Sequence, residues 1–195
     1  YIIYMLILSM SFMIRIGIVG FDTSHVVEFT KRINHFDVSK EFWVEGAKIV
    51  SGYPGEPTPA ASQEVLNERI EILRRYGVKI VDRPESLIKM VDAVMIEYNE
   101  GAKHLEASRI FIESGLPVFI DKPLASSLKD AKKIFELAES NGVPVFSASS
   151  LRYAREVQNL KKLKNEIGSI IGASTYSPGV IVEFNPGLFF YVIQP

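Results

Sequence analysis

The sequence predicts an α/β fold in which a doubly wound parallel sheet is followed by the first part of an α+β domain. Two observations lead to this prediction. From Ile14 onward, short runs of β-branched residues alternate with amphipathic stretches, the pattern of parallel strands joined by crossover helices. After Ser149 the alternation stops, and only a helical stretch at 155–166 and a strand-like stretch at 170–176 follow. This remainder is too short to bury a core of its own.

The composition is that of an ordinary globular protein. The chain has 195 residues, with 22 Lys and Arg against 23 Asp and Glu, and a net charge of −1. Such a balance gives no reason to expect nucleic acid or a membrane as a partner. The chain has no Cys, which excludes disulfides, thiolate metal sites and cysteine nucleophiles and is compatible with a cytoplasmic location.

Both ends of the sequence are unusual. The chain starts with Tyr1, and residues 1–12 are apolar without a preceding basic residue. This segment is too short for a spanning helix and lacks the basic start of a secretory signal. We therefore expect residues 1–12 to be an upstream extension before a natural start at Met13, with a membrane anchor or signal remnant as the alternative. The apolar run 187–195 ends without a polar cap, which predicts a chain truncated inside an element.

Six strands and four main helices are predicted before Ser149. The strands share short apolar runs: 15–20, 47–52, 78–81, 92–97, 117–121 and 144–148. The clearest helix is 127–141, where Leu128, Ala131, Phe135 and Ala138 are expected on one face and Gly142 ends the helix. The other helices are expected at 24–36, 66–76 and 104–114. These units predict a doubly wound sheet.

The turn after the first strand resembles an imperfect dinucleotide-binding fingerprint of the Rossmann type. Gly20 occupies the first glycine position, but Asp22 and His25 occupy the second and third. Gly20 can still form the tight turn, and the following helix can present N–H groups to a phosphate. His25 could neutralise that phosphate or pack against the helix start, and packing is the favoured interpretation.

Asp22 raises an electrostatic problem for a dinucleotide. Its carboxylate stands where the pyrophosphate should pass, and unit charges about 4 Å apart repel by roughly 4 kcal/mol at an effective dielectric of 20. The repulsion disappears if Asp22 turns away. Asp22, Thr23 and Ser24 are also favoured helix caps, so a capping role and a phosphate role both stay open.

A second departure concerns the ribose. The predicted second strand ends at 49–53 without the acidic residue that usually binds the ribose hydroxyls. Glu56 could substitute from the loop, although an exposed loop glutamate is the favoured interpretation. The sequence therefore predicts weakened dinucleotide binding, and it does not distinguish NAD from NADP.

The middle of the chain carries a more specific pattern. A strand is followed by Asn99 and His104, and the next strand runs into Asp121-Lys122-Pro123. Together with 14–20, this ordered set resembles the amino-terminal part of the Gfo/Idh/MocA oxidoreductases, whose pattern is a strand, an Asn, a His and then a strand ending in Glu-Lys-Pro. The resemblance extends from Ile14 to Ala154.

The chemistry of these residues is consistent with that resemblance. The carboxyl ends of parallel strands open onto one crevice, so the residues that follow them should lie on the cofactor side, namely Glu97, Tyr98, Asn99, Asp121 and Lys122. The Lys122 ammonium could bind a substrate hydroxyl or stabilise developing negative charge. Alternatively, Lys122 is a surface lysine paired with Asp121. His104 opens a helix and could equally cap or pack it.

The resemblance implies a domain organisation and an activity. It implies a dinucleotide-binding domain at 13–149, an incomplete substrate and dimerisation domain at 150–195, and a homo-oligomer in the full-length form. It implies an NAD(P)-dependent oxidoreductase that transfers hydride between nicotinamide and a carbinol carbon of a sugar, polyol or related compound. No metal is expected. Lys122 would be catalytic, and the cofactor-binding residues would be Gly20, Asp22, Thr23, Ser24, His25, Asn99, His104, Asp121 and Pro123.

Three features favour a different class of protein: Asp22, the missing acid after the second strand and Gln194. Where the family has a catalytic His preceded by an Asp, this chain has Gln194 and Phe190. Gln is not a general base. The alternatives are therefore a non-catalytic nucleotide- or ligand-binding Rossmann protein, or an inactive fragment.

Overall fold

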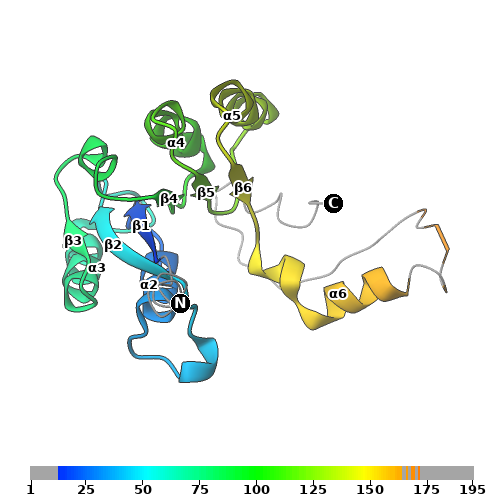
Figure 1. Ribbon diagram of the computed structural model, residues 1–195, viewed down its shortest axis with the longest axis horizontal. Coiled ribbons are helices and arrows are strands. Elements are labelled where there is room, and N and C mark those ends of the chain that lie inside the picture. The colour runs from blue at the N-terminus through cyan, green and yellow to red at the C-terminus, as the bar shows by residue number, and fades with distance from the viewer. Residues whose placement is uncertain (1–12, 164–165, 167, 170, 172–195) are drawn as a thin grey trace, which may run out of the picture.

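The structure is a computed structural model that describes residues 13–163, 166, 168–169 and 171. Its centre is a six-stranded parallel sheet with the order β3-β2-β1-β4-β5-β6 (Figure 1). The chain winds outward from β1 in one direction and then restarts at β4 in the other, so the strand order reverses between β1 and β4. The strands are β1 (Ile14–Val19), β2 (Ala47–Tyr53), β3 (Lys79–Ile80), β4 (Ala93–Ile96), β5 (Val118–Ile120) and β6 (Val145–Ser147). The predicted α/β fold with a doubly wound parallel sheet is confirmed.

Within the described residues, four helices cover the two faces of the sheet: α2 (His25–Asn34), α3 (Gln63–Arg75), α4 (His104–Glu113) and α5 (Leu128–Asn141). A further helix, α6 (Arg155–Lys162), follows β6. One core cluster joins Val26 of α2 and Leu73 of α3 to Ile18 and Ile49 of the sheet. The other joins helices α4 and α5 to strands β4 and β5. In Figure 1, α4 and α5 lie side by side above β4–β6.

The predicted apolar face of α5 is wrong in part. Leu128 and Phe135 are 72% and 48% exposed, whereas Ile134 is fully buried. The buried residues of the helix are instead Ile134 and Ala138, and Ile134 belongs to the core cluster that includes β4 and β5. The predicted ends are observed: the Ser127 hydroxyl accepts a hydrogen bond from the Asp130 N–H, and Gly142 adopts a left-handed conformation with φ 64°.

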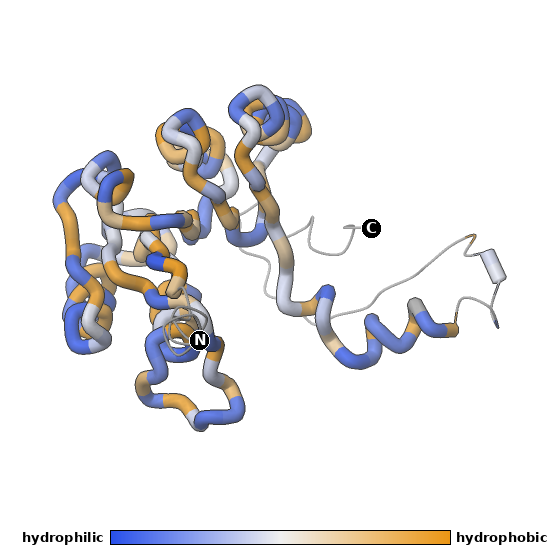
Figure 2. Tube along the Cα trace, viewed as in Figure 1, coloured by the Kyte–Doolittle hydropathy of each residue, from blue (hydrophilic) through white to orange (hydrophobic). Residues whose placement is uncertain are grey.

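The chain after β6 leaves the sheet. Helix α6 extends away from the rest of the molecule (Figure 1), and Figure 2 shows that it is mainly hydrophilic. Apart from Ile171, the predicted strand-like stretch 170–176 lies outside the described residues, as do Phe190, Gln194 and residues 1–12. Among the described helices, none combines the length and apolar character that a membrane span requires.

Candidate functional site

The strand register places the ends of β1, β4 and β5 side by side. Val19 of β1 pairs with Ile96 of β4, and Ile96 pairs with Ile120 of β5. These are the last residues of their strands, so the residues that follow them lie at one edge of the sheet, beside the reversal of strand order. Open parallel sheets bind their ligands at this position.

The turn after β1 depends on glycine. Gly20 has φ +87°, and a Cβ there would lie 2.7 Å from Cδ1 of Tyr98 and 2.9 Å from its backbone nitrogen. Gly55, with φ +75°, approaches the same ring, because its Cβ would lie 2.7 Å from the Tyr98 hydroxyl oxygen. The Tyr98 side chain therefore packs against both glycines, and its burial raises the pKa of its phenol.

Asp22 is turned into the protein. Only 3% of it is exposed. Its carboxylate accepts hydrogen bonds from the Asn99 N–H at 3.1 Å and from the Thr58 hydroxyl at 3.3 Å. Burial raises the pKa of Asp22, and the bond from Asn99 partly offsets this rise. The carboxylate thus joins the loops after β1, β2 and β4.

The residues before α2 cap the helix only in part. Ser24 forms no side-chain cap. The Thr23 hydroxyl accepts a hydrogen bond from the His25 N–H at 3.3 Å. The His25 ring contacts the edge of Phe29 and directs Nδ1 to a carboxylate oxygen of Asp121. His25 therefore combines packing with a polar contact across the site.

Two acids and this histidine form a compact cluster. One donor atom from each of His25, Glu97 and Asp121 lies within 4.8 Å of the other two. Glu97 is fully buried, and within the described residues neither of its carboxylate oxygens has a hydrogen-bond partner. Burial raises the pKa of Glu97 well above its usual range, Asp121 raises it further and Lys122 opposes the rise.

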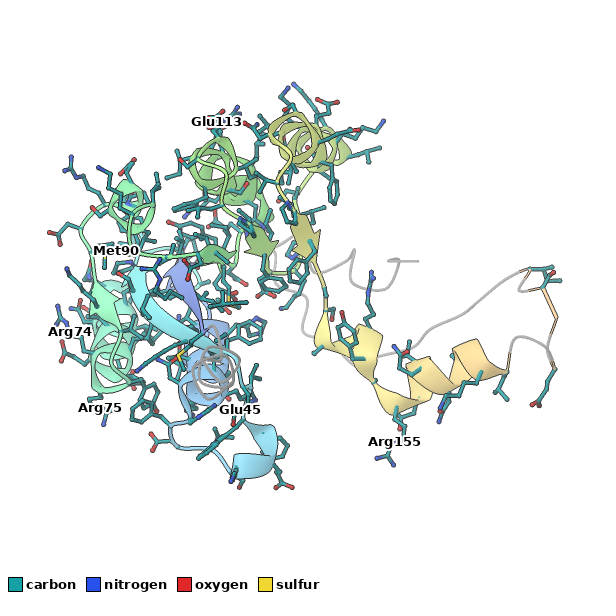
Figure 3. All side chains as sticks on the ribbon, in the orientation of Figure 1. Glu45, Arg74, Arg75, Met90, Glu113 and Arg155 are labelled. Carbon is teal, nitrogen blue, oxygen red and sulfur yellow. The ribbon has the colours of Figure 1, made fainter. Side chains whose placement is uncertain are left out.

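The expectation that Glu97 and Tyr98 open onto the crevice needs correction. Both lie at the predicted edge, but Glu97 is 0% and Tyr98 is 9% exposed. The apolar side chains of β4 and β5 and the approach of Tyr98 to the glycine turns account for this burial. In contrast to the buried Glu97, the charged side chains labelled in Figure 3 are exposed, namely Glu45, Arg74, Arg75, Glu113 and Arg155.

His104 connects two loops. It is fully buried, with Nε2 2.7 Å from the Tyr98 carbonyl oxygen and Nδ1 3.2 Å from the Leu124 carbonyl oxygen. A ring nitrogen donates to a carbonyl only where it carries a proton, and through these two contacts His104 lies between the segments after β4 and β5. Close packing completes this junction, since a Cβ on Gly101 would lie 2.9 Å from the backbone of Ala125.

Lys122 follows Asp121 at the centre of this edge. It is half-buried, and its peptide bond to Pro123 is cis. Its positive charge acts on Glu97, whereas Asp121 is in contact with His25. The sequence pattern predicts most of these residues at this edge, but it does not predict Thr58. The only sequence signal for Thr58 is its place in a loop rich in Pro and Gly, and that signal does not specify a contact with Asp22.

Comparison with known proteins identifies the family. The model of an oxidoreductase family with an NAD-binding Rossmann fold, Gfo/Idh/MocA, matches residues 14–149. The chain belongs to this family. It carries the family's NAD-binding fold, as the sequence analysis predicted.

The most informative relatives match only part of their own length. One is the scyllo-inositol 2-dehydrogenase (NADP(+)) IolU of Bacillus subtilis, 32% identical over 79 residues, which are 40% of this chain and 24% of that protein. Another is the putative oxidoreductase YceM of Salmonella typhimurium, 23% identical over 148 residues, which are 76% of this chain and 42% of that protein. The chain thus spans less than half the length of these relatives.

Solved structures support the fold. A putative NADPH-dependent oxidoreductase from Desulfitobacterium hafniense superposes with a TM-score of 0.63 at 20% identity, covering 80% of this chain and 40% of that one. An oxidoreductase from Agrobacterium radiobacter, in complex with NAD+, L-tartaric acid and magnesium, gives 0.61 at 17% identity, covering 78% and 40%. At these identities the likeness concerns the fold alone.

Proposed function

We propose that the protein is an NAD(P)-dependent oxidoreductase that transfers hydride between nicotinamide and a carbinol carbon of a sugar, a polyol or a related hydroxylated compound. One observation carries the proposal: the family match over 14–149 includes Lys122, which follows β5 at the edge of the sheet beside the reversal of strand order and whose charge acts on Glu97. The name of the inositol dehydrogenase relative supports the substrate class.

The turn after β1 fits a dinucleotide better than its sequence suggests. Gly20 provides the tight turn, α2 begins five residues later, and the Asp22 carboxylate is withdrawn into hydrogen bonds. The repulsion expected between Asp22 and a pyrophosphate is therefore reduced. The residues that would hold the cofactor are Gly20, Thr23, Ser24 and His25 after β1, with Asn99, Asp121 and Pro123 after β4 and β5, and Asp22 and His104 as positioning residues.

Lys122 would handle the substrate proton. When bound, nicotinamide supplies or accepts the hydride. The Lys122 ammonium would donate a hydrogen bond to the substrate oxygen, stabilise negative charge on it and exchange the hydroxyl proton.

A non-catalytic nucleotide- or ligand-binding protein is the second candidate. The packing of Tyr98 against Gly20 and Gly55 favours it, because an aromatic ring fills space at the cofactor edge. The two candidates differ in one measurable respect. A binding protein would take up the dinucleotide and show no hydride transfer with any sugar or polyol.

The wider proposal concerns organisation and location. It comprises a dinucleotide-binding domain at 13–149, the start of a substrate and dimerisation domain at 150–195, a homo-oligomeric full-length form and a cytoplasmic location. The family resemblance supports the first three. The absence of Cys from the sequence is compatible with the fourth.

The test combines binding with turnover. NADH and NADPH are titrated into the 195-residue chain, and the complete natural protein is assayed with a panel of sugars and polyols. We expect Lys122→Met to lower the rate by about 10² to 10⁴, the usual effect of losing a positioned acid-base group, and to change the free energy of unfolding by less than about 1 kcal/mol. Lys129→Met, at an exposed position of α5, is the control. Normal turnover by folded Lys122→Met contradicts the catalytic role.

A further inference from the structure

The cluster of His25, Glu97 and Asp121 is not explained by the fold. Its donor atoms come from three segments that are far apart in the sequence: the start of α2 and the residues after β4 and β5. The parallel register of β4 and β5 brings the two acids together, and the turn after β1 brings the histidine to them.

Glu97 is the member that points to a ligand. A fully buried carboxylate normally receives hydrogen bonds, and an unpaired one is costly. Within the described part of the chain, neither Glu97 oxygen receives one, although Asp22 at the same edge receives two. Glu97 therefore has the desolvation cost of burial without the compensation that Asp22 has.

We infer that His25, Glu97 and Asp121 bind one divalent metal ion of borderline softness, with Zn²⁺ as the best match. Imidazole nitrogen favours ions such as Zn²⁺, and carboxylate oxygens favour ions such as Mn²⁺ and Mg²⁺, so this mixed donor set suits ions that accept both. Three protein ligands leave a coordination position for water or a substrate hydroxyl.

The geometry and access are compatible with such an ion. Donor atoms around tetrahedral Zn²⁺ lie about 3.4 Å apart, given bonds of about 2.0 to 2.2 Å, and the three donors here lie within 4.8 Å of one another. The ion would replace the direct contact of His25 with Asp121. The His25 side chain is 32% exposed, which provides an entry route, whereas the two acids are buried.

Charge offers a competing explanation. Two ionised carboxylates beside a neutral imidazole carry two negative charges, which a divalent ion balances. A protonated His25 together with Lys122 would balance the same charge without a metal. The two explanations differ in one respect: only a metal site takes up Zn²⁺ with a defined stoichiometry and loses it when Glu97 is changed.

The experiment measures metal binding without cofactor or substrate. The chelator-treated 195-residue chain is titrated with Zn²⁺, Mn²⁺ and Mg²⁺ by calorimetry, with thermal unfolding as a second readout. We expect one Zn²⁺ per chain, an affinity above that for Mg²⁺ and a raised Tm. Glu97→Gln and His25→Gln should each weaken Zn²⁺ binding by at least tenfold, since even outer-shell changes cost about 10- to 100-fold.

His35→Phe is the matched control. His35 follows the same helix, stacks on Trp43 and lies 3.9 Å from Glu45, so it represents a half-buried histidine beside an acid. Phe keeps the stacking, and this variant should bind Zn²⁺ like the parent. Zn²⁺ binding that is absent from the parent, unaffected by Glu97→Gln or equally weakened by His35→Phe overturns the inference.

The metal site and the proposed activity fail separately. Lys122→Met should retain Zn²⁺ binding while turnover falls, because it removes a cation and no ligand. A protein that turns over but binds no Zn²⁺ refutes only the metal site. A protein that binds Zn²⁺ through Glu97 but never oxidises a polyol refutes only the oxidoreductase.

Discussion

Two buried carboxylates at the same edge of the sheet differ in how the fold treats them. Asp22 follows β1 and accepts hydrogen bonds from the Asn99 N–H and the Thr58 hydroxyl. Glu97 follows β4, is more deeply buried and has no hydrogen-bond partner among the described residues. Hydrogen bonds to both oxygens of Asp22 give this buried acid a structural role. Glu97 receives no such bonds from any described residue and needs another partner, which is why we place the metal beside Glu97.

The backbone that carries Asp22 and the backbone that carries Glu97 and Asp121 are also fixed by different contacts. The β1 side is fixed by the turn at Gly20, which leaves no room for a side chain against Tyr98. The β4 and β5 side is fixed one step further out by His104, which contacts the carbonyls of Tyr98 and Leu124. His104 thus positions the loops that carry Glu97 and Asp121 without supplying hydrogen bonds to those acids.

The largest expected effect comes from removing the satisfied acid. Asp22→Ala leaves the Asn99 N–H and the Thr58 hydroxyl, both on half-buried residues, without their acceptor, and an unsatisfied group costs about 1 to 3 kcal/mol when it is buried. We expect the free energy of unfolding to fall by about 2 to 4 kcal/mol in urea titrations. Asp22→Asn keeps an acceptor oxygen for the Asn99 N–H and should cost less than about 1 kcal/mol. Equal losses in the two variants would contradict the hydrogen-bonding role.

Removing the unsatisfied acid should have the opposite sign. Glu97→Met has a similar length and no unpaired oxygens, so we expect the chelator-treated protein to gain about 1 kcal/mol of unfolding free energy. The measurement is again urea unfolding at neutral pH. Glu113→Met, at an exposed position of α4, should change stability by less than about 0.5 kcal/mol. A clear loss of stability in Glu97→Met would mean that Glu97 is satisfied by an interaction within the protein.

The sequence predicted the sheet well because strand and helix patterns are local. All six strands and the ends of α5 follow from apolar runs and from Ser127 and Gly142. The start of α3 at Gln63, three residues before the predicted 66, was missed because the predicted start relied on the apolar stripe, which begins only at Leu66. The exposed Leu128 and Phe135 show that periodicity predicts a helix better than it predicts which face is buried.

The candidate site was predictable only in its location. The order of Asn99, His104 and Lys122 along the chain predicts the edge at which they meet, because parallel strands deliver their carboxyl ends together. The partners of Asp22 lie 36 and 77 positions away in the chain, and the contact of His25 with Asp121 in the cluster around Glu97 spans 96 positions. No local pattern specifies such contacts, so the side-chain directions came only with the structure.

The smallest expected effect concerns the two acids at the ends of strand β4. Asp92 precedes this strand and Glu97 follows it. Asp92 accepts hydrogen bonds from the Arg15 side chain at 2.7 and 3.0 Å and from its N–H at 2.8 Å. These bonds and the charge of Arg15 lower the pKa of Asp92 to about 2, against about 3.9 for an unfolded chain.

The sign of the pH dependence follows from this lowered pKa. Because the folded pKa is depressed, the contribution of Asp92 is fully present above about pH 4 and is lost as the pH falls toward 2. Asp92→Asn should therefore have a slightly lower Tm than the parent at pH 6, since the pair is exposed. The difference should shrink as the pH falls from about 4 toward 2 in thermal unfolding scans. For Asp22, whose pKa is raised, the parent should instead lose stability relative to Asp22→Asn as the pH rises. If the Asp92→Asn difference grows on acidification, the ion pair with Arg15 does not stabilise the fold.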